Sequence, residues 1–242
     1  MLGLGSALTG GVALGCPGAS CYSMSFDGSG DYLSFTETTF DIEDTGDELS
    51  ISFWAKRDGT GSQDSVLSNT NGYYRRIYFP DDGDELWMEG DHNGQEAKAS
   101  VTADTNWHHY VITLVGSSGS QATVAMYEDG SALTVTNTSL GGIDNKDFTI
   151  QRIGMDTATD NAFDGLLYQV AIWDSKLEAA EVSAIYNSGT PIDVAANEGS
   201  YVSSGDLIHL WNFDEGSGST AADSAGSLNA TITNATYSSL TP

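Results

Sequence analysis

Positive charge, proline, cysteine and long apolar runs are all scarce in this chain. Only 8 Lys and Arg residues stand against 34 Asp and Glu residues, which gives a formal net charge of −26. That charge would repel a duplex or another polyanion, so a basic groove for DNA or RNA is not expected. The excess of acid either keeps the protein soluble or supplies acidic loops that collect calcium, and the two are compatible.

The most apolar stretch, residues 1–15, contains five glycines and is too short to cross a bilayer, so membrane insertion is not expected. It has neither a positive start nor a small-residue cleavage site, and the pattern does not predict a cleaved signal peptide. The two cysteines, Cys16 and Cys21, lie on either side of a Pro-Gly turn. A disulfide between them and two free thiols are both open, whereas zinc is not expected without a second ligand pair.

What the chain does contain is many short alternating segments separated by Gly, Asp, Asn and Ser. Leu49–Lys56 places Leu49, Ile51 and Phe53 on one face, and Trp107–Val115 is apolar on both faces. Such segments recur about every ten residues with almost no βαβ alternation, which predicts an antiparallel β-sandwich.

The stretch Ala162–Pro191 departs from this pattern, because a two-sided apolar strand leads into one short helix. Ser175 is expected to cap the helix, with Glu178 as its reciprocal partner in a capping box. Gly189 is expected to end it. The sequence therefore predicts an all-β sandwich with a single docked helix.

Five segments resemble motifs of the laminin-G-like, concanavalin A-like lectin/glucanase domains. They are Phe26-Asp27-Gly28 with Asp31-Tyr32-Leu33, Ser52-Phe53-Trp54, Trp107-His108-His109 with Tyr127-Glu128-Asp129-Gly130, Phe163-Asp164-Gly165 through Tyr186-Asn187, and Leu210-Trp211-Asn212-Phe213-Asp214-Glu215-Gly216 with Asp223. Together these motifs cover most of residues 22–237. The resemblance implies a jelly-roll sandwich over residues 21–242, preceded by a glycine-rich arm at residues 1–20.

One departure concerns the order of these motifs. The tryptophan-containing segment that commonly opens the family's domain comes last here, within residues 206–237. Either the chain is circularly permuted or its tail is an added hairpin. Permutation predicts that Leu207–Phe213 or Leu228–Thr236 pairs inside the same sandwich.

The resemblance also implies a glycan- or protein-binding module that calcium often assists. Four turn aspartates are candidates for a calcium site: Asp27, Asp31, Asp156 and Asp164. Calcium needs several converging oxygens. The alternative is that these carboxylates bond their own backbone as Asx turns.

A second group of residues has the chemistry to bind sugar by ring stacking and hydrogen bonds to hydroxyls. These residues are Asn71, Tyr73, Tyr74, Tyr78, Trp87 and His92. The alternative is that the aromatic rings are half-buried cross-strand partners. Arg75 and Arg76, in the same span, either pair with surrounding acids or anchor an acidic neighbour.

Glucanases with this type of fold use two glutamates on one strand, with an aspartate between them. Glu85 and Glu89 keep that spacing, but Trp87 stands where the aspartate would be. No group is then left to adjust the pKa of a nucleophile. The chain is therefore not expected to be an enzyme.

Three functions fit these observations. The first is a non-enzymatic virion protein, such as a phage capsid decoration or fibre module, which assembles with other virion proteins and with copies of itself and attaches to cell-surface glycans. The second is a secreted or cell-surface carbohydrate-binding module, and the third a glycoside hydrolase. We expect the first, with the extracellular particle as its location and calcium as the one candidate cofactor.

Overall fold

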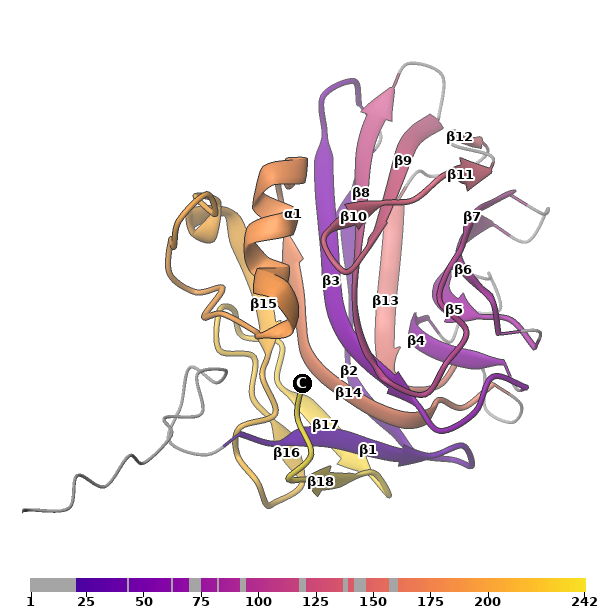
Figure 1. Ribbon diagram of the computed structural model, residues 1–242, viewed down its shortest axis with the longest axis vertical. Coiled ribbons are helices and arrows are strands. Elements are labelled where there is room, and N and C mark those ends of the chain that lie inside the picture. Colours follow the sequence, from indigo (N-terminus) through magenta and orange to yellow (C-terminus); the bar gives the residue numbers. More distant parts are fainter. Residues whose placement is uncertain are drawn as a thin grey trace, which may run out of the picture.

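The computed structural model describes residues 21–42, 44–61, 63–69, 75–81, 83–91, 95–117, 121–136, 139–141, 147–156 and 161–242. Within these ranges the chain forms two antiparallel sheets packed face to face, with one short α-helix on the outside (Figure 1). The predicted all-β sandwich with a single α-helix is therefore confirmed.

The first sheet has β14 and β3 at its centre. In spatial order its strands are β10 (Ser131–Ala132), β9 (Gln121–Glu128), β8 (Trp107–Ser117), β3 (Glu48–Arg57), β14 (Asp164–Trp173), β1 (Ser23–Asp27) and β18 (Thr236–Ser238), with β12 (Ser139–Gly141) on β9 and β15 (Leu207–Trp211) on β14.

The second sheet joins the middle of the chain to both of its ends. Its spatial order is β11 (Val135–Thr136), β7 (Gln95–Ser100), β6 (Glu85–Asp91), β5 (Arg76–Phe79), β4 (Asp64–Ser68), β13 (Asp147–Ile153), β2 (Tyr32–Asp41), β17 (Ala230–Thr233) and β16 (Thr220–Ala221).

The main core lies between the two sheets, because alternate residues of each strand point inward. Phe53 and Ile112 from the first sheet and Phe79, Met88 and Ile150 from the second are fully buried there. The residues between them point away from the core, and on the second sheet they form the face considered below.

The helix α1 (Ala179–Tyr186) packs on the outer face of the first sheet, on the opposite side of the sandwich from β5, β6 and β7 (Figure 1). Its apolar residues Val182 and Ile185 form a second, smaller core with Trp173 and Val111 of that sheet. One face of the first sheet is thus closed by the helix and the segment that follows it.

The predicted cap of this helix was wrong by one turn. The capping box joins Glu178 to Glu181, whose carboxylate accepts the Glu178 N–H at 3.0 Å. Ser175 is held instead by β3, since its carbonyl accepts the Ser50 hydroxyl at 2.7 Å. The Leu177 N–H in turn donates to the same Ser50 oxygen at 2.8 Å. These bonds keep the segment extended, so the helix begins later.

The C-terminal segment pairs inside the sandwich, as the permutation hypothesis predicts. β15 pairs with β14, β17 with β2, and β18 with β1. The tail therefore lies beside the first hairpin of the chain rather than apart from it. β4 is buried along its whole length but was not predicted from the sequence.

Two other predictions concern the beginning of the chain. Cys21 is disulfide-bonded, and Cys16 is the chain's one other cysteine. The expected arm at residues 1–20 lies outside the described residues. Within the part of the chain that is described, no helix has the length and apolarity needed to cross a membrane.

Candidate functional site

The outer face of β5, β6 and β7 brings together several aromatic and charged side chains for which the sequence predicts a role. Leu86 and Met88 of β6 point into the core, so Glu85, Trp87 and Glu89 point outward. No described helix covers this sheet, in contrast to the first one (Figure 1).

One row of this face runs across three strands through Tyr78, Trp87 and Lys98, which are direct register partners. The Tyr78 and Trp87 ring centroids are 5.6 Å apart. The Lys98 ammonium lies 4.3 Å from the Trp87 ring centre, and the Trp87 indole N–H donates to Glu85 at 2.7 Å. The indole is thus held in one orientation while it remains half-buried rather than covered.

The neighbouring row is built around Arg76. Its guanidinium donates to Glu89 at 2.8 Å and to Asp156 at 2.6 Å, and lies 3.9 Å from the centre of the Tyr78 ring. Asp156 also accepts the Asn161 side-chain amide. This ion-pair network is largely shielded from solvent, because Arg76 is 8% and Asp156 is 3% exposed. It lies on the side of the face that adjoins β4.

The two described members of the predicted sugar-binding set play different parts. Tyr78 is 3% exposed, and burial raises the pKa of its phenol far above the ordinary value. Its ring packs against the Arg76 guanidinium and lies beside the Trp87 ring, which is half-buried. The other four members, Asn71, Tyr73, Tyr74 and His92, lie outside the described residues.

Three of the four aspartates predicted to bind calcium meet at the turn between β1 and β2 and the start of β14. The Asp31 carboxylate accepts the Asp27 N–H at 3.0 Å, and the Asp27 carboxylate accepts the Ser29 N–H at 2.9 Å. Burial, followed by the charges of Asp58 and Asp27, raises the pKa of Asp164.

The contact between Asp27 and Ser29 is that of an Asx turn, and the fourth aspartate, Asp156, pairs with Arg76 elsewhere. Among the residues that the structure describes, no three His, Cys, Asp or Glu side chains are grouped so as to hold a metal ion. Calcium binding at these aspartates stays a prediction.

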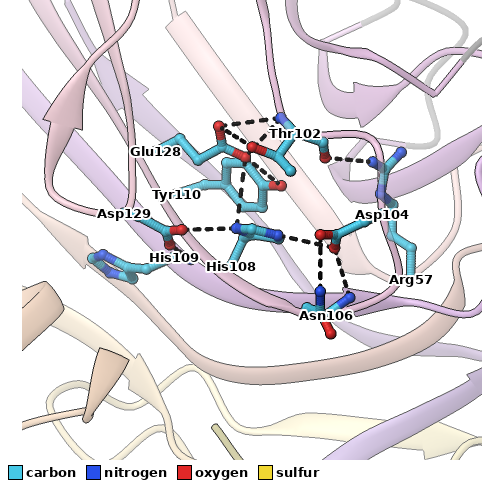
Figure 2. A network of polar contacts seen from close by, with 9 residues as sticks. All are labelled: Arg57, Thr102, Asp104, Asn106, His108, His109, Tyr110, Glu128 and Asp129. Atoms are coloured by element: carbon cyan, nitrogen blue, oxygen red, sulfur yellow. Dashed lines mark hydrogen bonds and ion pairs between the residues drawn. The ribbon is translucent and has the colours of Figure 1, made fainter. Parts of the chain in front are cut away.

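A further polar network surrounds His108 at the start of β8 (Figure 2). Its ring nitrogens lie 2.8 Å from Asp129 and 3.0 Å from Asp104, and 3.8 Å from Glu128. The hydrogen bond to Asp129, aided by the one to Asp104, raises the pKa of His108 to about 9. Glu128 also accepts the Thr102 N–H at 2.9 Å, so the network ties β8, β9 and the preceding loop together.

The adjacent His109 points to the other face of the same sheet. Its ring lies 4.7 Å from that of Trp54, and its Nε2 is 2.8 Å from the Ser52 hydroxyl. Burial lowers the pKa of His109 to about 3. The two histidines thus lie on opposite faces of the sheet, because successive side chains alternate along a strand.

The two glutamates of the glucanase-like spacing are both engaged with neighbours. Glu85 accepts the Trp87 indole N–H, and Glu89 accepts the Arg76 guanidinium. Trp87 separates them on the strand in place of an acid. The arrangement holds an aromatic ring between two hydrogen-bonding carboxylates.

Comparisons with known proteins agree with this architecture. The solved structures include a candidate carbohydrate-binding protein of Bacteroides ovatus, which is 17% identical with a TM-score of 0.64 over 93% of this chain. This chain spans 62% of that protein's length. A heptameric SAP-like pentraxin from Limulus polyphemus is 16% identical with a TM-score of 0.51, over 71% of this chain and 84% of that one.

No curated protein matches the chain. The laminin-G model of the concanavalin A-like lectin/glucanases superfamily matches residues 27–183, which is more than half of the sequence. These residues include both the β5–β7 face and the His108 network. The chain belongs to the concanavalin A-like lectin/glucanase superfamily.

Proposed function

We propose that this protein binds carbohydrate without transforming it, on the outer face of β5, β6 and β7. The observation that carries the proposal is the half-buried Trp87 indole, held in place by Glu85 and Lys98 on a sheet face without a helix. Its lectin-like fold and the likeness to a candidate carbohydrate-binding protein support the same assignment.

In this proposal the Trp87 ring stacks against the apolar face of a sugar ring. A fixed aromatic side chain supplies contact area at little cost in conformational entropy. Glu85 and Glu89 accept hydrogen bonds from sugar hydroxyls, and Lys98 donates to ring or hydroxyl oxygens. In this proposal no group of the row cleaves the glycosidic bond, and the sugar is released unmodified.

The test is the loss of binding in Trp87→Ala, measured by glycan array and then by calorimetry on the glycans found. An aromatic residue at the centre of a binding site contributes about 2 kcal/mol or more, so affinity should fall about 30-fold or more. Trp107→Ala removes a half-buried tryptophan of the first sheet and serves as the matched control. Equal losses in both variants, or none in either, would contradict the proposal.

Attachment to a virus particle remains the finer form of this proposal. A virion protein that recognises host glycans would use the same face and would assemble with copies of itself or with other virion proteins. Sedimentation of the purified chain tests the assembly, and a monomer at all concentrations would favour a secreted or cell-surface module.

A further inference from the structure

The few cations of this acidic chain are unevenly placed. Three of its four arginines lie where the neighbouring strands β5, β4 and β13 adjoin: Arg75, Arg76 and Arg152. Arg152 comes 76 positions after Arg76 in the sequence. Arg76 and Arg152 are both register partners of Ser68 on β4 and so flank it on either side. Their guanidinium groups converge, since Arg76 donates to the Asp156 carboxylate and Arg152 to the Asp156 carbonyl at 3.2 Å.

Two members of this arginine cluster lack an acidic partner within the described part of the chain. Arg75 donates to the Thr149 hydroxyl at 3.2 Å, and its Nε is buried without any hydrogen-bond partner. Arg152 lies 4.3 Å over the centre of the Tyr32 ring. Both side chains are half-buried. In a chain with 34 acidic residues, both of these guanidinium groups are positioned by neutral groups.

Neutral partners orient a cation without cancelling its charge. A guanidinium offers five N–H donors in a planar fork that matches a carboxylate in two bonds at once. The cluster carries three positive charges against the two carboxylates of Glu89 and Asp156. Within the described residues the three guanidinium groups thus outnumber the carboxylates that pair with them, whereas the whole chain has a formal net charge of −26.

We infer that this arginine cluster binds the carboxylate of an acidic sugar, so that the protein prefers glycans containing uronic or sialic acid. This inference rests on the proposed function, because the cluster adjoins the row that contains Trp87. Trp87 and Arg152 stand three strand spacings apart, about 14 Å, so the ligand that reaches both is an oligosaccharide. The net charge repels a long polyanion, which favours a short or sparsely charged one.

The test compares each glycan with its own uncharged form. Oligosaccharides ending in galacturonate, glucuronate or sialic acid are titrated as free acids and as methyl esters by calorimetry. The free acid of at least one of them should bind about tenfold or more tightly, the value of one charge-assisted hydrogen bond. The double variant Arg75→Gln with Arg152→Gln should bind both forms equally.

A matched control separates local contact from overall charge. Lys56→Gln with Lys176→Gln makes the same change in formal net charge, from −26 to −28, at cations paired with Asp58 and Glu178 instead. This control should keep the preference for the free acid.

The outcomes distinguish the two proposals. Equal binding of acid and ester by the unmodified protein overturns the inference and leaves carbohydrate binding in place. A preference that both double variants lose overturns it as well, because the cause is then long-range charge. No binding of any glycan contradicts the proposed function together with the inference.

Discussion

Two charged clusters of this molecule, one around His108 and one around Arg76, differ in how completely their charges are matched. Around His108, one imidazole meets Asp129, Asp104 and Glu128 within 4 Å (Figure 2). Among the described residues of the arginine cluster, Arg76 is the one guanidinium of the three that pairs with carboxylates. The first cluster ties neighbouring strands together, whereas Arg75 and Arg152 in the second are held by a hydroxyl, an aromatic ring and a backbone carbonyl.

The difference shows that burial and charge have to be considered together. A charge enclosed by opposite charges stabilises the fold, because removing one partner leaves the others without compensation. A charge that contacts a hydroxyl or an aromatic ring contributes little to stability, because its removal leaves no buried opposite charge without a partner. Stability measurements should therefore separate the two kinds of residue, even where they are adjacent in sequence.

The largest effect is expected for Arg76→Leu. Both of its carboxylate partners are largely buried, with side-chain exposures of 14% for Glu89 and 4% for Asp156. Removal of the cation should lower the free energy of unfolding by about 3 kcal/mol or more, as for other broken buried pairs. Urea denaturation measures this. Arg76→Lys keeps the charge but not the planar guanidinium, so its free energy of unfolding should fall by less. A decrease below about 1 kcal/mol in Arg76→Leu would remove the distinction between the clusters.

His108→Gln should lower stability by about 2 kcal/mol at pH 6.5, with a dependence on pH that identifies the cause. The folded pKa of about 9 exceeds the unfolded value of about 6.5. The stability contributed by the proton is therefore fully present below pH 6.5 and is lost as the pH rises through 9.

The measurement is urea denaturation at intervals from pH 6 to pH 10, on the unmodified protein and on His108→Gln. The difference between the two should shrink across this range. A constant difference would mean that the imidazole acts by its packing alone.

Asp214 offers the reverse case, a carboxylate without a cation. Burial, then the charge of Glu215, raises the pKa of Asp214 to about 6, and one of its oxygens has no hydrogen-bond partner. A folded pKa above the unfolded one means that ionisation opposes folding as the pH rises through 6. Asp214→Asn should therefore stabilise the protein by about 1 kcal/mol at pH 7, after allowance for solvent screening, and by less at pH 4.5.

The control for Asp214→Asn is Glu215→Gln, which removes the same charge from an exposed neighbour. Its effect on the free energy of unfolding should be a few tenths of a kcal/mol at both pH values. Equal effects of the two variants would show that overall charge, not the burial of Asp214, sets the result.

The sequence predicted much of the fold because local periodicity carries that information. Alternation in Leu49–Lys56 and Trp107–Val115 predicted β3 and β8, and the pairing of the tail followed from its motif order. β4 was missed because Asp64 and Ser65, although polar, are fully buried there. A pattern of apolar alternation cannot show that polar groups are enclosed by neighbouring strands.

The site was less predictable, because distant segments form it. The aromatic residues of the span 71–92 have similar patterns in sequence, but Tyr78 is buried and Trp87 is half-buried. Arg75 and Arg76 had two possible roles in sequence, and Arg76 takes the first by pairing with acids. A role for Arg152 could not be predicted from its sequence neighbours, because the pairing of β13 with β4 brings it to the cluster.

The smallest expected effect on stability is that of Arg75→Gln with Arg152→Gln. Neither guanidinium has an acidic partner in the described chain, and glutamine can still donate to the Thr149 hydroxyl and to the Asp156 carbonyl. The free energy of unfolding should change by less than about 0.5 kcal/mol, as for ordinary surface substitutions. A loss comparable to that of Arg76→Leu would mean that all three arginines form one structural network, and the donors attributed to a ligand would belong to the fold. If the free energy of unfolding is unchanged and the same variant binds the free acid and the methyl ester equally, these two arginines serve binding and not stability.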